Sequence, residues 1–338
     1  MRGWVVAFVA AVAAVSACSS DKAGSGDGDA SKPAATGPGV IIDTDLSLWW
    51  DDASTIGLAN VLHEQGDIRL LGVVSDVPND VAVAALDAID TAYGHDDLPL
   101  GAVVQSDADT FEHGYTDTLV DRLPHSVESS DDVPEAVALY RQLLADEPDG
   151  SVTIVSIGGY TNLAGLLASD ADDDSPLDGR ELVEKKVKQT VIMDGLFPNG
   201  APAVTNQKID LDAAQAVVEG DWPTPIAWVD GFGGIETKVG GRLCTETDAD
   251  HPMRLVYETL FGCEPPGDGN WDAPAFLYAI GDIPDAFEEL GQGGAAVINK
   301  DGGLSWEIPS SRPDDVYVHI TDQQALNARI DELLVASP

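Results

Sequence analysis

Residues 40–53 read Val-Ile-Ile-Asp-Thr-Asp-Leu-Ser-Leu-Trp-Trp-Asp-Asp-Ala, and the order of residue types in this stretch decides the fold class. Its three apolar residues, 40–42, predict a buried β-strand. Acidic residues follow at once, and a stretch with amphipathic helical spacing begins at Ala53. We therefore expect a strand, a loop and a helix in that order.

The same alternation continues along the chain. Further strands are predicted at residues 68–74, 152–157, 190–193 and 225–229. Helices are predicted at residues 53–63, 81–93, 133–144, 162–168 and 212–219. Strands that alternate with helices indicate an α/β fold with a mostly parallel, doubly wound sheet flanked by helices. Since no second linker is evident, we expect a single domain at residues 40–335.

The net charge excludes one class of partner. The 338 residues include 59 acidic and 17 basic residues, for a net charge of −42. Nucleic-acid binding needs clustered Lys and Arg side chains that neutralise phosphates, so we expect no nucleic-acid partner. The same charge disfavours binding to an anionic membrane surface. It also disfavours the binding of phosphorylated substrates unless a metal ion intervenes.

The first 39 residues read as an export signal and a spacer. A basic Arg2 precedes an apolar stretch at 4–15, which is too short for a comfortable membrane span. The sequence Val-Ser-Ala-Cys at 15–18 resembles a bacterial lipobox, which predicts a signal peptide at 1–18 and a lipid on Cys18. Residues 19–39 are rich in Ser, Gly, Asp and Pro and predict a flexible tether. We expect an exported protein, lipid-anchored at the outer face of a bacterial membrane; the alternative is a plain signal peptide.

Two cysteines remain beyond the leader, Cys244 and Cys263. An exported protein is exposed to oxidising conditions, so these two residues are candidates for a disulfide that closes a short loop. The spacing alone does not establish that their Cα atoms are close enough.

Four carboxylates gather at the end of the first strand. Asp43 and Asp45 follow the strand directly, and Asp51 and Asp52 open the next helix. Ligands of α/β sheets bind beyond the carboxyl ends of the strands. Carboxylates crowded there repel one another unless a cation neutralises them, and hard oxygen ligands suit calcium or magnesium. The alternative is that Asp51 or Asp52 only caps the helix.

Several blocks together resemble the inosine-uridine nucleoside hydrolase family. These blocks are Asp43-Thr44-Asp45 with Asp51-Asp52-Ala53, Leu71-Gly72-Val73-Val74 with Asn79, residues 156–164, residues 191–214 with Asn199 and Asn206, and Trp271-Asp272-Ala273-Pro274-Ala275. They follow the family's order over nearly the whole folded part. The resemblance implies a nucleoside hydrolase fold and cleavage of N-ribosidic bonds.

The resemblance also implies a set of calcium ligands. Asp45 would bind calcium and orient or deprotonate the attacking water. Asp52 would be a bidentate ligand, the Ile157 carbonyl a backbone ligand, and Asp272 the remaining carboxylate. Calcium lowers the pKa of a bound water, and a nearby carboxylate takes its proton.

A second set of residues would hold the ribose. The resemblance assigns Asp51, Asn79 and Asn206 to the ribose hydroxyls, with Asn199 as a further candidate. Asp43 would tighten the site without touching substrate. Ribose is uncharged, so an acidic pocket tolerates it.

The position before the last metal-binding Asp often holds a His in the family, which protonates the leaving base. Here it holds Trp271, as in the purine-preferring branch. A stacking indole favours purine nucleosides. The alternative is a Trp packed in the core.

Five positions depart from the family's pattern. Ser47 stands where Gly is usual, and Gly tolerates backbone conformations that are costly for other residues. Trp49 and Trp50 either line the substrate pocket or cover the metal loop. Val204 replaces an expected carboxylate. Asp194 replaces a Gly, and we expect it in a solvated turn rather than against substrate.

The leading hypothesis is a calcium-dependent nucleoside hydrolase for purine salvage outside the membrane. The alternative is a non-catalytic lipoprotein that binds nucleosides or sugars. A phosphatase with Asp43 as nucleophile would leave Asp51 and Asp52 unexplained. The sequence leaves both a monomer and a homo-oligomer open.

Overall fold

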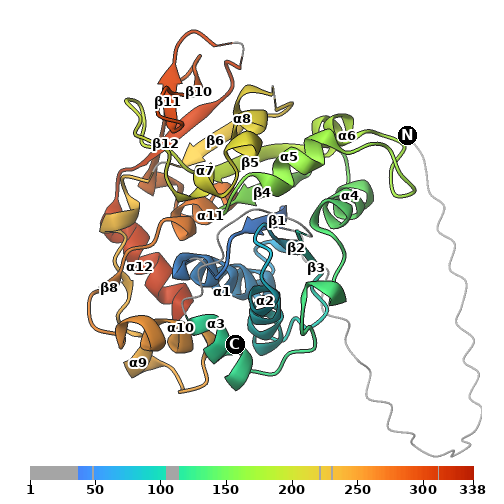
Figure 1. Cartoon of the computed structure of the whole chain (residues 1–338). Helices are drawn as coiled ribbons and strands as arrows, with labels where there is room; N and C mark the ends of the chain where they lie inside the picture. Colours follow the sequence, from blue (N-terminus) through green and yellow to red (C-terminus); the bar gives the residue numbers. More distant parts are fainter. Residues whose placement is uncertain (1–36, 48, 104–113, 221, 230, 311) are drawn as a thin grey trace, which may run out of the picture. The chain divides into compact units, whose positions relative to one another are not determined.

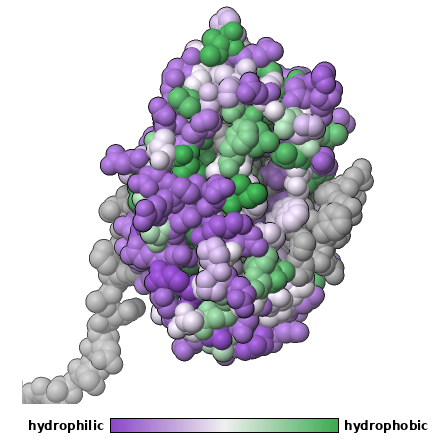
Figure 2. Space-filling model, turned by 90° about the vertical axis from the view of Figure 1, so that its left-hand side faces the viewer, coloured by the Kyte–Doolittle hydropathy of each residue, from purple (hydrophilic) through white to green (hydrophobic). Residues whose placement is uncertain are grey.

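The computed structural model describes residues 37–47, 49–103, 114–220, 222–229, 231–310 and 312–338. The predicted signal peptide at 1–18, with Cys18, lies outside the described residues, as does the predicted tether up to residue 36. The domain from Ala35 to Pro338 forms one unit by its internal contacts. Most of the visible face in Figure 2 is hydrophilic, with smaller hydrophobic patches, as the acidic composition leads one to expect.

An eight-stranded sheet crosses this domain in the order β3-β2-β1-β4-β5-β6-β12-β9 (Figure 1). The strands are β1 (Gly39–Thr44), β2 (Arg69–Ser75), β3 (Leu100–Ala102), β4 (Val152–Ser156), β5 (Val187–Met193), β6 (Ile226–Val229), β9 (Phe287–Leu290) and β12 (Val316–Ile320). All neighbours pair in parallel except β9, which runs antiparallel to β12. β1 lies between β2 and β4 and is parallel to both, so the carboxyl ends of β2 and β4 flank the carboxyl end of β1.

Alternating side chains of the strands build two hydrophobic cores. In β1, Val40 and Ile42 join one core, while Ile41 points to the other. Adjacent residues of β5 divide in the same way, with Val191 in the first core and Ile192 in the second. The helices that connect parallel strands lie on both faces of the sheet, so both faces are buried.

Helices cover the two faces. The first core is covered by α1 (Trp50–Gln65), α2 (Asp80–Ala92), α3 (Tyr115–Arg122), α10 (Pro252–Phe261), α11 (Asp272–Ile280) and α12 (Gln323–Leu334). The second core is covered by α4 (Ala136–Asp146), α5 (Thr161–Ala168), α6 (Gly179–Lys186) and α8 (Leu211–Glu219). Among the described residues, no helix has both the length and the apolar character to span a membrane.

The predicted fold class is confirmed: the structure is α/β, with a mostly parallel sheet between helices. Each of the five predicted strands and five predicted helices overlaps an observed one. Within the main sheet, the prediction missed β3, β9 and β12. β3 has three residues, too few for a periodicity, and β9 reads Phe-Glu-Glu-Leu, where two charged residues hide the pattern.

Two small antiparallel pairs lie apart from the main sheet: β7 (Val239–Gly240) with β8 (Gly267–Asp268), and β10 (Ala295–Ile298) with β11 (Leu304–Glu307). The disulfide Cys244–Cys263 links α9 (Leu243–Glu246) to the residues after α10, with 5.8 Å between the Cα atoms.

Candidate active site

The loop after β1 delivers carboxylates to the carboxyl edge of the sheet. Asp45 follows β1 directly, and Asp51 and Asp52 occupy the first turn of α1. All three side chains are at most 4% exposed. The N-terminus of a helix favours negative charge through its free N–H groups, so α1 helps to hold these carboxylates.

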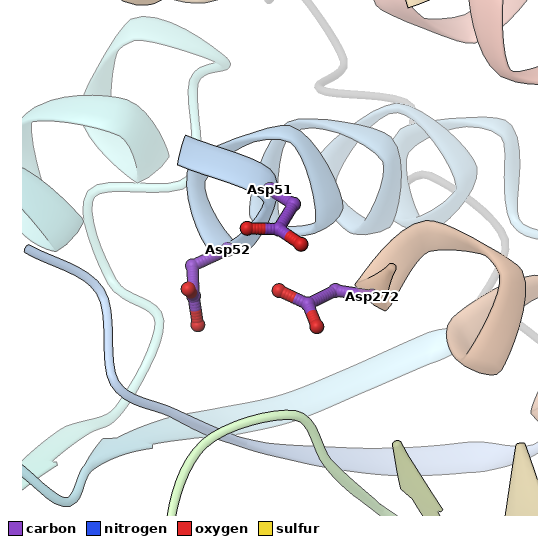
Figure 3. Close-up of side chains that lie close together, drawn as sticks. All are labelled: Asp51, Asp52 and Asp272. Carbon is purple, nitrogen blue, oxygen red and sulfur yellow. The ribbon is translucent and has the colours of Figure 1, made fainter. Parts of the chain in front are cut away.

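A second helix brings its own carboxylate to the same place. α11 begins at Asp272, and oxygen atoms of Asp51, Asp52 and Asp272 all lie within 4.8 Å of one another. Figure 3 shows the three side chains directed toward one another, two from α1 and one from α11. This spacing is short enough for one cation to contact all three groups.

Asp45 is beside this group rather than in it. It shares a hydrogen bond with the Asp52 carboxyl group, and the Thr44 hydroxyl also donates to Asp52. Burial, the largest cause, raises the pKa of Asp45 and of Asp52 well above the ordinary 3.8. Repulsion from neighbouring carboxylates raises both further. A bound cation would offset both effects.

The donor set fits a hard divalent cation. One oxygen each of Asp45, Asp52 and Asp272 is buried and has no hydrogen-bond partner. Buried carboxylate oxygens are normally hydrogen-bonded or bound to a metal. The unpartnered atoms are all oxygen, which suits calcium or magnesium rather than a soft metal.

The Ile157 carbonyl, the predicted backbone ligand, lies just past β4. It accepts a hydrogen bond from the side-chain amide of Asn206 at 3.0 Å, and the same amide donates to the Met193 carbonyl at 3.1 Å. Asn206 therefore ties the ends of β4 and β5 together. A carbonyl oxygen has a second lone pair, so this bond leaves room for a cation.

Of the other predicted ribose ligands, Asn79 lies near the site and Asn199 does not. Asn79 caps α2 through its side-chain oxygen and donates to the Ser47 hydroxyl at 3.4 Å. Asn199 is exposed and does not line the pocket described below. Phe197, two residues earlier in the chain, is buried against Trp228.

Ser47 keeps a glycine-like backbone, with a φ of 106°. Its buried N–H donates to the Tyr115 hydroxyl at 3.0 Å, and that hydroxyl donates to the Trp49 carbonyl at 2.6 Å. Tyr115 thus braces the metal loop from α3. Nothing in the local sequence signals this contact, because 68 residues separate the partners.

A pocket of about 380 Å³ opens beside the carboxylates. Among the residues that the structure describes, those that line the pocket are Trp49, Trp50, Asp51, Met193, Asp194, Gly195, Leu196, Val204, Thr205, Asn206, Gly231 and Trp271. The Trp271 indole N–H donates to the Gly231 carbonyl at 3.1 Å, so its polar edge is satisfied while the ring lines the pocket. Trp271 is partly exposed and is not a core residue.

The expectation of a solvated turn at Asp194 is wrong. Asp194 is 1% exposed and accepts hydrogen bonds from Tyr160, Gln207 and the Gly195 N–H at 2.5–2.6 Å. Burial, offset in part by these bonds, raises its pKa to about 6. The three donors satisfy the carboxylate and fix α7 (Thr205–Ile209) to the ends of β4 and β5.

Sequence reasoning missed Asp76. This residue follows β2 directly and is fully buried. The rule that ligands gather beyond strand ends applied to it as much as to Asp45. Because the chain is rich in Asp, a single Asp after a predicted strand did not stand out as a candidate site residue.

Comparison with known proteins agrees with this geometry. The profile of the inosine-uridine preferring nucleoside hydrolase family matches residues 40–252. No curated protein matches the chain. A plant nucleoside hydrolase shares 18% identity at a TM-score of 0.67, over 88% of this chain and 99% of its own. Two further structures, each covering 88% of this chain and 99% of their own at a TM-score of 0.66, are a purine-preferring ribonucleoside hydrolase from Gardnerella vaginalis (16% identical) and an inosine-uridine preferring nucleoside hydrolase from Bacillus anthracis (15% identical).

At these identities the structures establish the fold, and the family profile covers more than half of the chain. The chain therefore belongs to the inosine-uridine preferring nucleoside hydrolase family, and it is a hydrolase that acts on N-glycosyl compounds.

Proposed function

We propose that this chain hydrolyses the N-glycosidic bond of ribonucleosides with the help of a calcium ion, and that it prefers purines. The observation that supports the proposal is the convergence of Asp51, Asp52 and Asp272 beside a pocket lined by Trp271. The carboxylates supply a cation site, and the indole supplies a surface for a flat base.

Water is the nucleophile in this reaction. Asp45, Asp52, Asp272 and the Ile157 carbonyl would hold the calcium, which would supply a positioned water of lowered pKa. Asp45 accepts the water proton as the oxygen bonds to the anomeric carbon. The bond to the base nitrogen breaks, and the base leaves with the electron pair.

Ribose is held by its hydroxyl groups. Asp51 lines the pocket and accepts hydrogen bonds, while the side-chain amides of Asn79 and Asn206 lie beside the metal loop and the ends of β4 and β5. Positive charge develops on the ribose in the transition state, and the surrounding carboxylates stabilise it.

The protonation of the leaving base needs a source other than a basic side chain. The described residues that line the pocket include no His, Lys or Arg. A purine protonated on its ring nitrogen leaves more readily, and stacking on the electron-rich face of Trp271 stabilises that cation. The lack of positive charge also disfavours substrates that carry phosphate.

We also propose export and a lipid anchor on Cys18, with the hydrolase domain at the outer face of the membrane. The lipobox at 15–18 and the tether composition support this. Metabolic labelling with a fatty-acid analogue tests it: wild-type chain should be labelled and Cys18→Ala should not. Equal labelling of both would contradict the anchor.

The hydrolase proposal is tested with a panel of purine and pyrimidine nucleosides, with and without a calcium chelator. We expect free base from purine nucleosides, loss of activity with chelator and recovery with calcium. Asp45→Asn should abolish turnover, whereas the matched variant Asp212→Asn, which removes an exposed carboxylate in α8, should not change it. Tight nucleoside binding without base release would instead support the non-catalytic binding protein.

A further inference from the structure

Asp76 carries a buried carboxylate that the proposed reaction does not use. Its backbone N–H donates to the Thr44 carbonyl at 3.0 Å, which places it beside the end of β1. The residue is 0% exposed, and neither of its carboxylate oxygens has a well-aligned hydrogen bond, although the nearby N–H groups of Gly159 and of Asp76 itself lower its pKa in part. A buried carboxylate without partners is costly, whether it is charged or protonated, and so it points to a missing ligand.

Two glycines between β4 and α5 make room for this side chain. A Cβ atom on Gly158 would lie 2.6 Å from Asp76 Oδ2 and 2.5 Å from the Asp45 nitrogen. A Cβ atom on Gly159 would lie 3.2 Å from the same Asp76 oxygen. The Asp76 carboxylate is therefore pressed against the loop that carries the Ile157 carbonyl.

The charge of Asp76 acts on the metal-binding carboxylates. After burial, repulsion from Asp76 is the largest cause that raises the pKa of Asp45, and repulsion from Asp43 and then from Asp52 raises the pKa of Asp76. No ion pair formed between described residues involves Asp45, Asp52, Asp76 or Asp272. The described residues thus concentrate carboxylates around the proposed cation site, and no described Lys, Arg or His side chain forms an ion pair with them.

We propose that Asp76 is part of the cation site and strengthens divalent-cation binding through its charge from the Asp45 side. It lies outside the group formed by Asp51, Asp52 and Asp272 and is not one of the proposed calcium ligands, so it acts on the ion through its charge. This inference rests on the cation site of the proposed function.

Calcium titration of the calcium-free full chain, by calorimetry and by thermal melting, tests the inference. We expect Asp76→Asn to weaken calcium binding by about tenfold or more, because the variant loses a negative charge that attracts the calcium ion in a site poorly screened by solvent. The calcium-free variant should melt at a higher temperature than wild type, since repulsion is relieved. Its calcium-induced rise in melting temperature should be smaller.

Asp90→Asn is the matched control, because it removes a buried carboxylate of α2 that hydrogen-bonds Asn60 and lies outside the cation site. Its calcium affinity should equal that of wild type. Asp76→Val, of similar volume, serves if Asp76→Asn does not fold.

Equal calcium affinity of wild type and both Asp76 variants would overturn the role of Asp76 alone. Absence of calcium binding by wild type would overturn this inference together with the proposed metal. A wild-type chain that binds calcium more tightly than the Asp76 variants but releases no base from any nucleoside would support the inference and contradict only the proposed hydrolysis.

Discussion

The Asp51 carboxylate accepts a hydrogen bond from the backbone N–H of Trp271 at 3.0 Å, across 220 residues of sequence. This bond joins the N-termini of α1 and α11. Both residues line the pocket, so one contact sets the position of a proposed ribose ligand against the proposed base-stacking indole. Burial raises the pKa of Asp51 to about 6, and the N–H of Trp271 lowers it in part.

Asp51→Asn should reduce kcat/KM for a purine nucleoside by about 10- to 100-fold, the usual effect of losing a charged hydrogen bond. The amide oxygen of Asn still accepts the Trp271 N–H, so the fold should persist. Steady-state kinetics with calcium in excess measure the effect. Asp80→Asn, an exposed residue in the first turn of α2, should leave kcat/KM unchanged. Equal kinetics for both variants would refute the role of Asp51.

Trp271→Phe should lower kcat/KM for purine nucleosides by about tenfold, because stacking contributes about 1–3 kcal/mol per base and the smaller ring retains part of it. Pyrimidine nucleosides should be affected less. Trp306→Phe is a matched control outside the pocket, since Trp306 also donates its indole N–H to a backbone carbonyl, that of Gly291. A loss that is the same for purines and pyrimidines would argue against stacking.

Ser47→Gly should raise the free energy of unfolding by about 1 kcal/mol, because a φ of 106° is strained for any residue with a Cβ atom. Ser47→Ala keeps the strain and removes only the hydroxyl contact with Asn79, so it should not stabilise the protein. Urea denaturation of the three proteins measures the difference. A Gly variant no more stable than the Ala variant would show that the backbone is relaxed.

Asp90 should make stability depend on pH. Burial raises its pKa from 3.8 to about 7, and the Asn60 amide at 2.6 Å offsets this in part. The folded chain therefore keeps a proton that the unfolded chain has lost. The stabilisation is complete below about pH 4 and is lost as the pH rises through 7, on the order of 4 kcal/mol in all. Denaturation between about pH 4 and 8, with calcium in excess, should show this slope in wild type and a flatter one in Asp90→Asn. Parallel curves would contradict it.

Local patterns predicted the parts of the site that lie close together in the chain. Apolar runs and helical spacing located β1 and α1, and the strand-end rule identified Asp45 after β1 and Asp52 in the first turn of α1. The rest depended on long-range packing. Asn199 shows this most clearly, because it is exposed and does not line the pocket, whereas Phe197, two residues before it, packs against Trp228 and Trp306.

The sequence by itself determined the α/β fold class and the carboxylates of the metal loop, because apolar periodicity and residue order act over a few neighbouring residues. Asp272 was assigned to the same cation site by the family resemblance and not by a local pattern, and only the tertiary structure decided that Tyr115 braces Ser47 and that Asp76 is buried beside the site. These relationships join segments far apart in the chain. They depend on how the helices pack on the sheet, and no local pattern of residue types encodes that packing.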